Sequence, residues 1–403
     1  MMHPTPQRGG TAVLVAVLAL LTALAPLSVD MYLPAMPRLA AAFAVAPARV
    51  QYSLSLFFIG MALGQLAYGP LSDRYGRRPV LFFGICLYLA ATVACALSAT
   101  VDALIAARAV QGVGAAAGPV MARAVVRDRF HGARAASVMS YVVMVMAGAP
   151  MVAPVVGGLV LAVADWHAIF WVLFGYAAVS LAALAMVLSE SHPPARRTRD
   201  RGLAAQYLGY LSLLGRPSVV LFLVCGGLMF GALFTYVGTS AFVYIEQFGV
   251  PESTFGFYFG ANVLALIVGS YLNGRLVTRF GYLALLGVAV ANTLTCSLVL
   301  LATTATGFGG FWGVAVPLFF LLSTVGVAGA NTVAGMLDLV PDSAGAVSAL
   351  FGVCQFGCGA LASWLAGALG GHADAMAAVM SLCAAGSVAA YAALRRPGAL
   401  QSD

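Results

Sequence analysis

GQLAYGPLSDRYG, residues 64–76, recurs as GSYLNGRLVTRFG, residues 269–281, with three glycines, one leucine and one arginine at identical spacing. Each copy begins inside an apolar stretch and ends in a short gap that contains arginine. Matching segments at equivalent places in the two halves of a chain indicate an internal repeat. The sequence therefore predicts two halves of similar architecture.

The apolar stretches around both copies determine the fold class. The chain is 62% hydrophobic and 8% charged, whereas soluble domains carry about 25% charged residues. A membrane-spanning helix needs about 20 mostly apolar residues, and a helix satisfies its own backbone hydrogen bonds in lipid. Two-residue alternation, which is typical of barrel strands, is absent. We expect an all-α membrane protein with twelve transmembrane helices in two six-helix bundles, at about 11–29, 51–70, 80–100, 103–122, 135–163, 167–188, 218–244, 254–273, 282–302, 311–335, 343–369 and 375–394.

The distribution of arginine predicts the orientation in the membrane. All 20 basic residues are Arg, and Arg concentrates in cytoplasmic loops. With the N-terminus inside, only Arg38 and Arg49 fall on the outer side, so both termini are expected in the cytoplasm. The basic patch with interleaved aromatics that marks nucleic-acid binding is missing. The cytoplasmic set is Arg8, Arg74, Arg77, Arg78, Arg123, Arg127, Arg129, Arg134, Arg196, Arg197, Arg199, Arg201, Arg216, Arg275, Arg279, Arg395 and Arg396.

The longest hydrophilic connection divides the chain. Residues 189–216 are polar and rich in arginine, and they fall between the sixth and seventh stretches. We interpret them as a solvated cytoplasmic linker. The predicted parts are an N-terminal bundle over 1–188, the linker, a C-terminal bundle over 217–396 and a tail over 397–403.

Several classes of protein are disfavoured by the sequence. A Walker A loop requires a Lys on the phosphates, and the chain has no Lys. Neither a Gly-x-Ser-x-Gly elbow nor a His-Glu-x-x-His pair is present, so we expect no enzyme, no cofactor and no metal site. The seven Cys all fall inside predicted spans and fit packing positions. A channel would need a filter or a charged ring, and the internal repeat favours a transporter instead.

Three ordered motifs resemble those of the major facilitator superfamily. GPLSDRYGRR at 69–78 looks like its motif A, RAVQGVG at 108–114 looks like motif B, and GAPMVAPVVGG at 148–158 is similar to motif C of the antiporter branch. DMYLPAMP at 30–37 and ARAVVRD at 122–128 resemble the bicyclomycin-resistance (Bcr/CflA) group of drug:proton antiporters. The resemblance implies alternating access of two bundles around a central cavity.

Two charges stand within predicted spans, Asp30 and Arg108. A charge at the centre of a span costs about 2.5–3.5 kcal/mol on insertion scales and persists where it faces a cavity or a partner. The resemblance implies that spans 1 and 4 line the cavity, so we expect Asp30 to be the proton and cation site and Arg108 its modulator. The alternatives are an Asp30 exposed at the outer end of span 1 and an Arg108 that pairs with backbone carbonyls. Glu246 is either a second acidic site or an exposed rim residue.

Motif A implies a conformational gate. By the resemblance, Asp73 meets the start of span 11 near Asp342, and Arg74 pairs with Asp128. A carboxylate at a helix N-terminus gains about 0.3–1 kcal/mol, which suits a latch that breaks in each cycle. The predicted gate comprises Gly69, Asp73, Arg74, Gly76, Arg77 and Asp128.

Motif C predicts a kinked and closely packed fifth span. Pro150 and Pro154 each remove a backbone donor, and Gly148, Gly157 and Gly158 allow a neighbouring helix to approach. The antiporter function of this segment follows from the resemblance alone.

Polar and aromatic side chains inside spans are candidate substrate contacts. We select Tyr52, Phe57, Gln111, Tyr236 and Gln355. The alternative is ordinary packing, since polar side chains within spans often bond across helices.

The sequence thus predicts a proton-coupled multidrug exporter, with bicyclomycin or chloramphenicol-like compounds as substrates. The alternative is an exporter of one metabolite, an amino acid or a sugar, on the same scaffold. The expected partners are protons, a small-molecule drug and the lipid bilayer. We expect a multi-pass monomer in the bacterial inner membrane, driven by the proton gradient without a cofactor.

Overall fold

The computed structural model describes residues 8–193 and 203–396. The tail at 397–403 and part of the predicted linker lie outside these ranges. The described chain folds into helices, and twelve of them are long and apolar enough to cross a membrane. Each overlaps one of the twelve predicted stretches, so the predicted fold class is confirmed.

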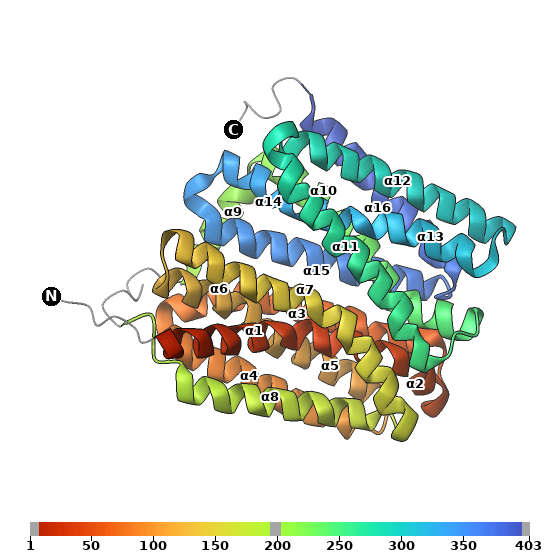
Figure 1. Cartoon of the computed structure of the whole chain (residues 1–403), viewed down its shortest axis with the longest axis horizontal. Helices are drawn as coiled ribbons and strands as arrows, with labels where there is room; N and C mark the ends of the chain where they lie inside the picture. The colour runs from red at the N-terminus through yellow and green to blue at the C-terminus, as the bar shows by residue number, and fades with distance from the viewer. Residues whose placement is uncertain (1–7, 194–202, 397–403) are drawn as a thin grey trace.

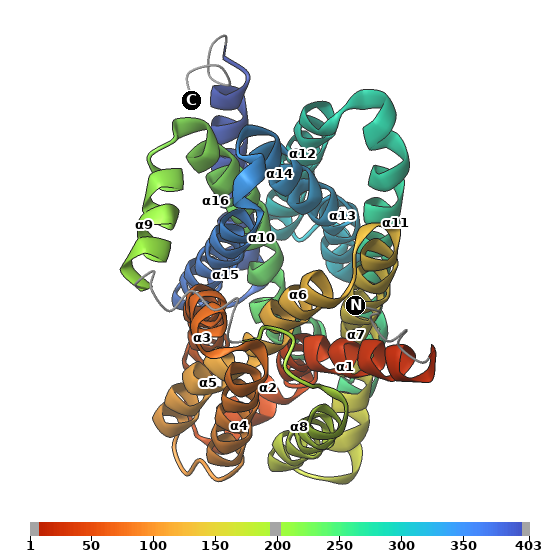
Figure 2. The ribbon, with the colours of Figure 1, turned by 90° about the vertical axis from the view of Figure 1, so that its left-hand side faces the viewer.

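The two halves form two adjacent bundles, with the N-terminal half below and the C-terminal half above in Figure 1. Figure 2 views the same bundles from the end where the described chain begins. The N-terminal half comprises α1 (Arg8–Asp30), η1 (Leu33–Ala35), α2 (Met36–Ala42), α3 (Pro47–Tyr75), α4 (Arg77–Ala96), α5 (Val101–Ala115), α6 (Ala117–Arg129), α7 (Gly132–Val163) and α8 (His167–Val187). The C-terminal half comprises α10 (Pro217–Ala241), η3 (Phe242–Gln247), α11 (Glu252–Phe280), α12 (Tyr282–Thr306), α13 (Gly310–Ser323), α14 (Val325–Leu339), η4 (Pro341–Ser343), α15 (Ala344–Ala368) and α16 (Ala373–Leu394).

The repeated segment occupies equivalent places in both halves. Its last glycine joins two helices with a positive φ, 103° at Gly76 between α3 and α4 and 78° at Gly281 between α11 and α12. Its first glycine allows a close crossing, because a Cβ on Gly64 would meet the break between α5 and α6. A Cβ on Gly269 would meet the end of α13 beside the break before α14. The repeat in the sequence is therefore a repeat in structure.

The first span is longer than the sequence predicts. The apolar stretch was expected to end near residue 29, but the candidate span runs over Ala12–Ala42 and includes α1, η1 and α2. The prolines Pro34 and Pro37 interrupt the helix without ending the span. As a consequence, Asp30 lies in the middle of the span rather than at its outer end.

The linker contains a helix that the sequence analysis did not predict. α9 (Leu203–Leu214) packs against α10, α3 and α15, so it contacts both halves. Tyr210 of α9 reaches motif A, with its hydroxyl 3.7 Å from the position of a Cβ on Gly69. Burial raises the pKa of the Tyr210 phenol, and the charges of Tyr207 and Asp73 add to the effect. The predicted linker thus includes a helix that contacts both halves, while most of the described side chains of α9 from Tyr207 onward stay exposed.

Candidate functional site

A cavity of about 290 Å³ lies between the two halves. It is lined by α1, α3, α6 and α7 on one side and mainly by α10, α11 and α15 on the other. Ligand sites are usually concave and apolar with a few polar groups, and this cavity has that character. Its polar lining residues are Thr22, Asp30, Gln65, Arg123, Tyr236, Asn262 and Gln355.

Asp30 is the acidic residue among those that line this cavity. Asp30 is the last residue of α1, at the point where the helix is interrupted, and it is 4% exposed. It forms no ion pair with any residue in the described ranges. Tyr236 of α10 lines the same cavity from the other half. The structure thus places Asp30 in the cavity and disagrees with the alternative of a water-exposed rim residue.

Arg108 lies behind the cavity wall instead of in the cavity. It is fully buried, and its guanidinium carbon lies 4.4 Å from the ring centroid of Phe57 and 4.6 Å from that of Tyr32. Its Nη1 donates to Oε1 of Gln111 at 2.6 Å, not to a backbone carbonyl. It forms no ion pair with Asp30 among the described side chains. Arg108 therefore does not line the cavity itself. Of the residues named here that it contacts, Phe57 is the one that lines the cavity.

The five predicted substrate contacts divide into two groups. Phe57, Tyr236 and Gln355 line the central cavity. Tyr52 does not line it, and Gln111 is fully buried, where it connects Arg108 to Thr92 by a 2.8 Å hydrogen bond. The prediction for Tyr52 and Gln111 is wrong for this state, because motif B directs Gln111 toward α4 rather than toward the other half.

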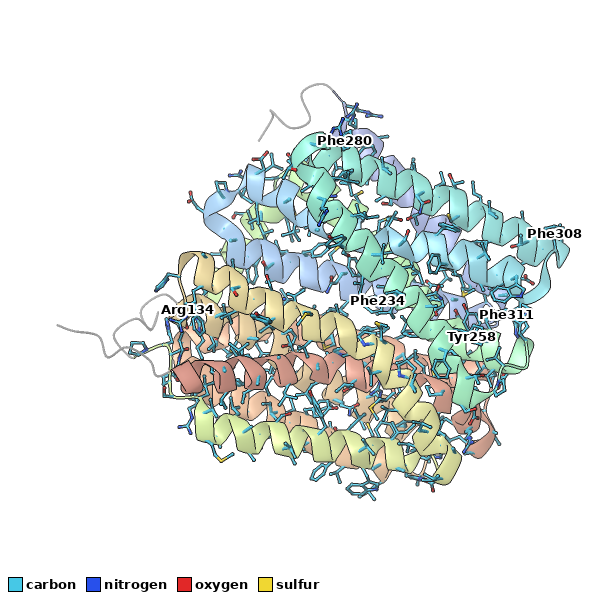
Figure 3. The ribbon with its side chains drawn as sticks, in the orientation of Figure 1. Arg134, Phe234, Tyr258, Phe280, Phe308 and Phe311 are labelled. Atoms are coloured by element: carbon cyan, nitrogen blue, oxygen red, sulfur yellow. The ribbon has the colours of Figure 1, made fainter. Side chains whose placement is uncertain are left out.

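Aromatic rings from both halves meet in the cavity. Phe58 of α3 lies 4.3 Å from Phe234 of α10, and Phe234 lies 5.4 Å from Phe356 of α15, measured between ring centroids. Figure 3 shows Phe234 near mid-length, where the two bundles face each other. Sequence reasoning missed these rings, since a Phe in an apolar helix gives no signal that separates a cavity wall from a packed core.

A hydrogen bond fixes one polar group on the opposite wall. Nδ2 of Asn262 donates to the hydroxyl of Tyr236 at 2.9 Å, and the Tyr236 ring stacks on Phe259 at 5.4 Å and 17°. Because these contacts hold the ring, the Tyr236 hydroxyl is a positioned polar group opposite Asp30.

The gate residues form an ion cluster, but with a different arginine from the one predicted. Arg77 is 2% exposed, and its Nε donates to Asp128 at 3.0 Å while its Nη1 donates to Asp73 at 2.5 Å. Arg74 instead lies over the ring of Tyr75. The predicted Arg74–Asp128 pair is wrong, because α3 continues to Tyr75 and the turn at Gly76 directs the next arginine toward the end of α6.

The predicted latch is open in this structure. Asp73 and the start of span 11 at Asp342 and Ser343 line a vestibule of about 820 Å³ between the halves. No side chain caps the helix start at Ser343. The vestibule lies at the end of the bundles that carries the predicted cytoplasmic arginines, including Arg127.

The opposite end is closed by the fifth span. A Cβ on Gly157 would lie 2.3 Å from the carbonyl oxygen of Met31, and one on Gly158 would lie 2.7 Å from that of Glu252 in α11. Pro154 is buried inside α7, whereas Pro150 lines the cavity. The glycines of this motif therefore allow α7 to contact α11 across the boundary between the halves.

An ion pair lies at the same closed end. Nη2 of Arg38 in α2 lies 2.6 Å from Oε2 of Glu252 in α11. Glu246 is exposed at the end of η3, interacts electrostatically with His372 and does not line the central cavity. The cavity is thus shut at this end, and the open vestibule lies at the end that carries the predicted cytoplasmic arginines.

The fold and the cavity define a class of protein. Twelve candidate spans in two repeated bundles, with a cavity between the bundles and closure at one end, are the architecture of a secondary transporter. The sequence profile of the Major Facilitator Superfamily matches residues 18–363, and the chain belongs to this family. The protein is therefore a multi-pass membrane transporter.

Named relatives and a solved structure agree with this family. The chain is 32% identical over 386 residues to a bicyclomycin resistance protein homolog of Haemophilus influenzae, covering 96% of each chain. It is 28% identical over 360 residues to multidrug resistance protein D of Escherichia coli, covering 87% of each. A crystal structure of a D-xylose-proton symporter superposes with a TM-score of 0.76 at 14% identity, covering 96% of this chain and 97% of the symporter.

Proposed function

We propose that this protein is a secondary exporter that moves amphipathic drugs out of the cell in exchange for protons. The names of its relatives support drug efflux, and the apolar, aromatic cavity suits varied amphipathic molecules. Bicyclomycin and chloramphenicol-like compounds are the first candidates to test. The exporter acts as a monomer in the bacterial inner membrane, with the proton gradient in place of a cofactor.

The single observation that carries the proposal is the position of Asp30. It is a buried carboxylate without an ionic partner in a cavity that both halves line. Burial in low dielectric disfavours the charged form of a carboxylate, whereas a cationic drug beside it favours that form. Proton and drug therefore compete for one group, which is the minimum that exchange requires.

During transport, closure alternates between the two ends of the cavity. In the described state the outer end is shut by α7 on α11 and the vestibule is open, so a drug enters from the cytoplasm and displaces the proton from Asp30. Opening of the outer end and closure of the motif A latch would then expose Asp30 to the periplasm, where a proton releases the drug. A ligand shifts such an equilibrium only by its differential affinity for the two states.

The test is Asp30→Asn in proteoliposomes with an imposed pH gradient. We expect gradient-driven accumulation of tetraphenylphosphonium, a cationic probe, to fall by at least about tenfold, because the variant cannot exchange a proton at this position. Counterflow of neutral chloramphenicol without a gradient should persist, because it requires alternating access but no proton exchange.

Glu246→Gln is the matched control, since Glu246 lies outside the cavity. It should retain the accumulation of the wild type. Equal accumulation by Asp30→Asn and wild type would remove Asp30 from coupling, and absence of counterflow in the wild type would refute secondary transport.

A further inference from the structure

A cationic side chain, that of Arg123, lies at the boundary between the central cavity and the vestibule. Gln65 of α3 and Arg123 of α6 are the two residues that line both spaces. A molecule that passes from the vestibule to Asp30 must therefore pass both side chains. Sequence analysis assigned Arg123 only to the cytoplasmic arginines that set the orientation.

The charge of Arg123 has no acidic partner within the described residues. Its Nη2 donates to Oε1 of Gln65 at 3.2 Å, and it takes part in no ion pair. Arg77, at the start of α4 in the same half, contacts two carboxylates instead. A guanidinium carries five N–H donors, so Arg123 retains donors that its neutral partner does not occupy.

Asp30 and Arg123 lie toward opposite ends of the central cavity. α1 and α6 cross where a Cβ on Gly118 would meet the carbonyl oxygen of Leu21. From this contact Asp30 is about two and a half helical turns toward the outer end, and Arg123 is about one and a half turns toward the vestibule. Both line the same cavity, whose remaining lining is mainly apolar and aromatic.

We propose that Arg123, held by Gln65, is a carboxylate-binding subsite, and that the preferred substrates are zwitterionic amphiphiles. The carboxylate of the substrate accepts hydrogen bonds from Arg123, and its apolar body extends along the rings of Phe58 and Phe234 that line the cavity, so that its cationic group points toward Asp30. Guanidinium–carboxylate contacts are charge-assisted and often bidentate. The inference rests on the proposed drug export and specifies its substrate class.

The experiment compares one molecule with and without its carboxylate. Binding of norfloxacin, which carries an ammonium and a carboxylate, and of its methyl ester is measured by equilibrium dialysis on the purified full chain. The ester is more apolar, so simple partitioning would favour it. We expect wild type to bind the acid at least about tenfold more tightly than the ester, and Arg123→Gln to remove this preference.

Two further variants keep the test independent of folding defects. Gln65→Glu retains the size of the side chain and supplies a carboxylate that occupies Arg123, so it should also remove the preference for the acid. Arg127→Gln is the matched control, because Arg127 lines the vestibule and not the central cavity, and it should retain the preference.

The outcomes separate this inference from the proposed function. The carboxylate subsite would be overturned if wild type bound acid and ester with equal affinity, or if Arg123→Gln and Gln65→Glu kept the preference for the acid. If wild type still bound tetraphenylphosphonium in that case, the proposed drug export would remain. Failure of wild type to bind tetraphenylphosphonium, norfloxacin and chloramphenicol would refute both.

Discussion

Arg77→Ala should destabilise the protein more than any other single replacement of a motif A arginine. The guanidinium is buried and donates to Asp73, Asp128 and the hydroxyl of Ser72. Its removal leaves Asp128 as a largely buried carboxylate without its cation, and the loss of one partner of a buried ion pair costs about 3–5 kcal/mol. We expect a clear fall in the melting temperature of the detergent-purified protein, measured by thermal aggregation followed by size-exclusion chromatography.

Arg74→Ala is the control that distinguishes the structure from the sequence motif. Arg74 lies over Tyr75 at the surface, and an exposed cation–π contact contributes only about 0.5–1 kcal/mol. Its melting temperature should therefore remain close to that of wild type. The double variant Arg77→Ala, Asp128→Asn should recover part of the loss, since the uncompensated charge is gone. A larger loss in Arg74→Ala than in Arg77→Ala would contradict the observed ion cluster.

The arginine cluster shows how far the sequence could predict this protein. Composition and the repeated glycine segment were sufficient for the twelve spans and the two halves, because hydropathy and turn chemistry act locally. They could not tell Arg74 from Arg77, since both fall in one short basic gap. The choice depends on where α3 ends and on the direction that Gly76 gives to the next residue, with φ at 103°.

The cavity was predictable in part for a similar reason. Asp30 could be identified from the sequence because a lone acid in an apolar span is costly. The position of Asp30 along the span could not be predicted, because the span continues beyond the prolines to Ala42. Arg123 was missed because an arginine near a predicted cytoplasmic end has the same sequence signal whether it lines a cavity or lies in water. Only the structure shows that Arg123 lines both the central cavity and the vestibule.

The glycines of motif C, which lie in α7, were predicted as a group, but each has a different neighbour in the structure. Gly157 allows the interrupted part of span 1 to pack closely against α7. Gly158 allows the same for α11 of the other half. Gly148 has nothing within 4 Å of an added Cβ. A sequence motif cannot express this difference, because the neighbours of each glycine come from distant parts of the chain.

Gly158→Leu should abolish transport by preventing closure of the outer end. An added Cβ would lie 2.7 Å from the carbonyl oxygen of Glu252, a backbone atom at the start of α11 that cannot move aside as a flexible side chain would. The clash exists only while α7 contacts α11, so the variant should populate the state in which the outer end is open. We expect a cysteine placed at Gly260, which is buried in α11 with room for a Cβ 3.7 Å from the carbonyl oxygen of Met151 in α7, to become reactive toward a membrane-impermeant maleimide added from the periplasmic side, whereas drug counterflow is lost.

Gly148→Leu is the matched control in the same helix and the same motif, because its added side chain meets open space. It should retain both counterflow and the low reactivity of the cysteine at the buried position of Gly260. The result also tests the orientation inferred from arginine: labelling of the Gly158→Leu variant only from the cytoplasmic side would place the closed end inside. Full counterflow by Gly158→Leu would mean that the α7–α11 contact is not needed to shut the cavity, and that the Arg38–Glu252 ion pair and its neighbours are sufficient for closure.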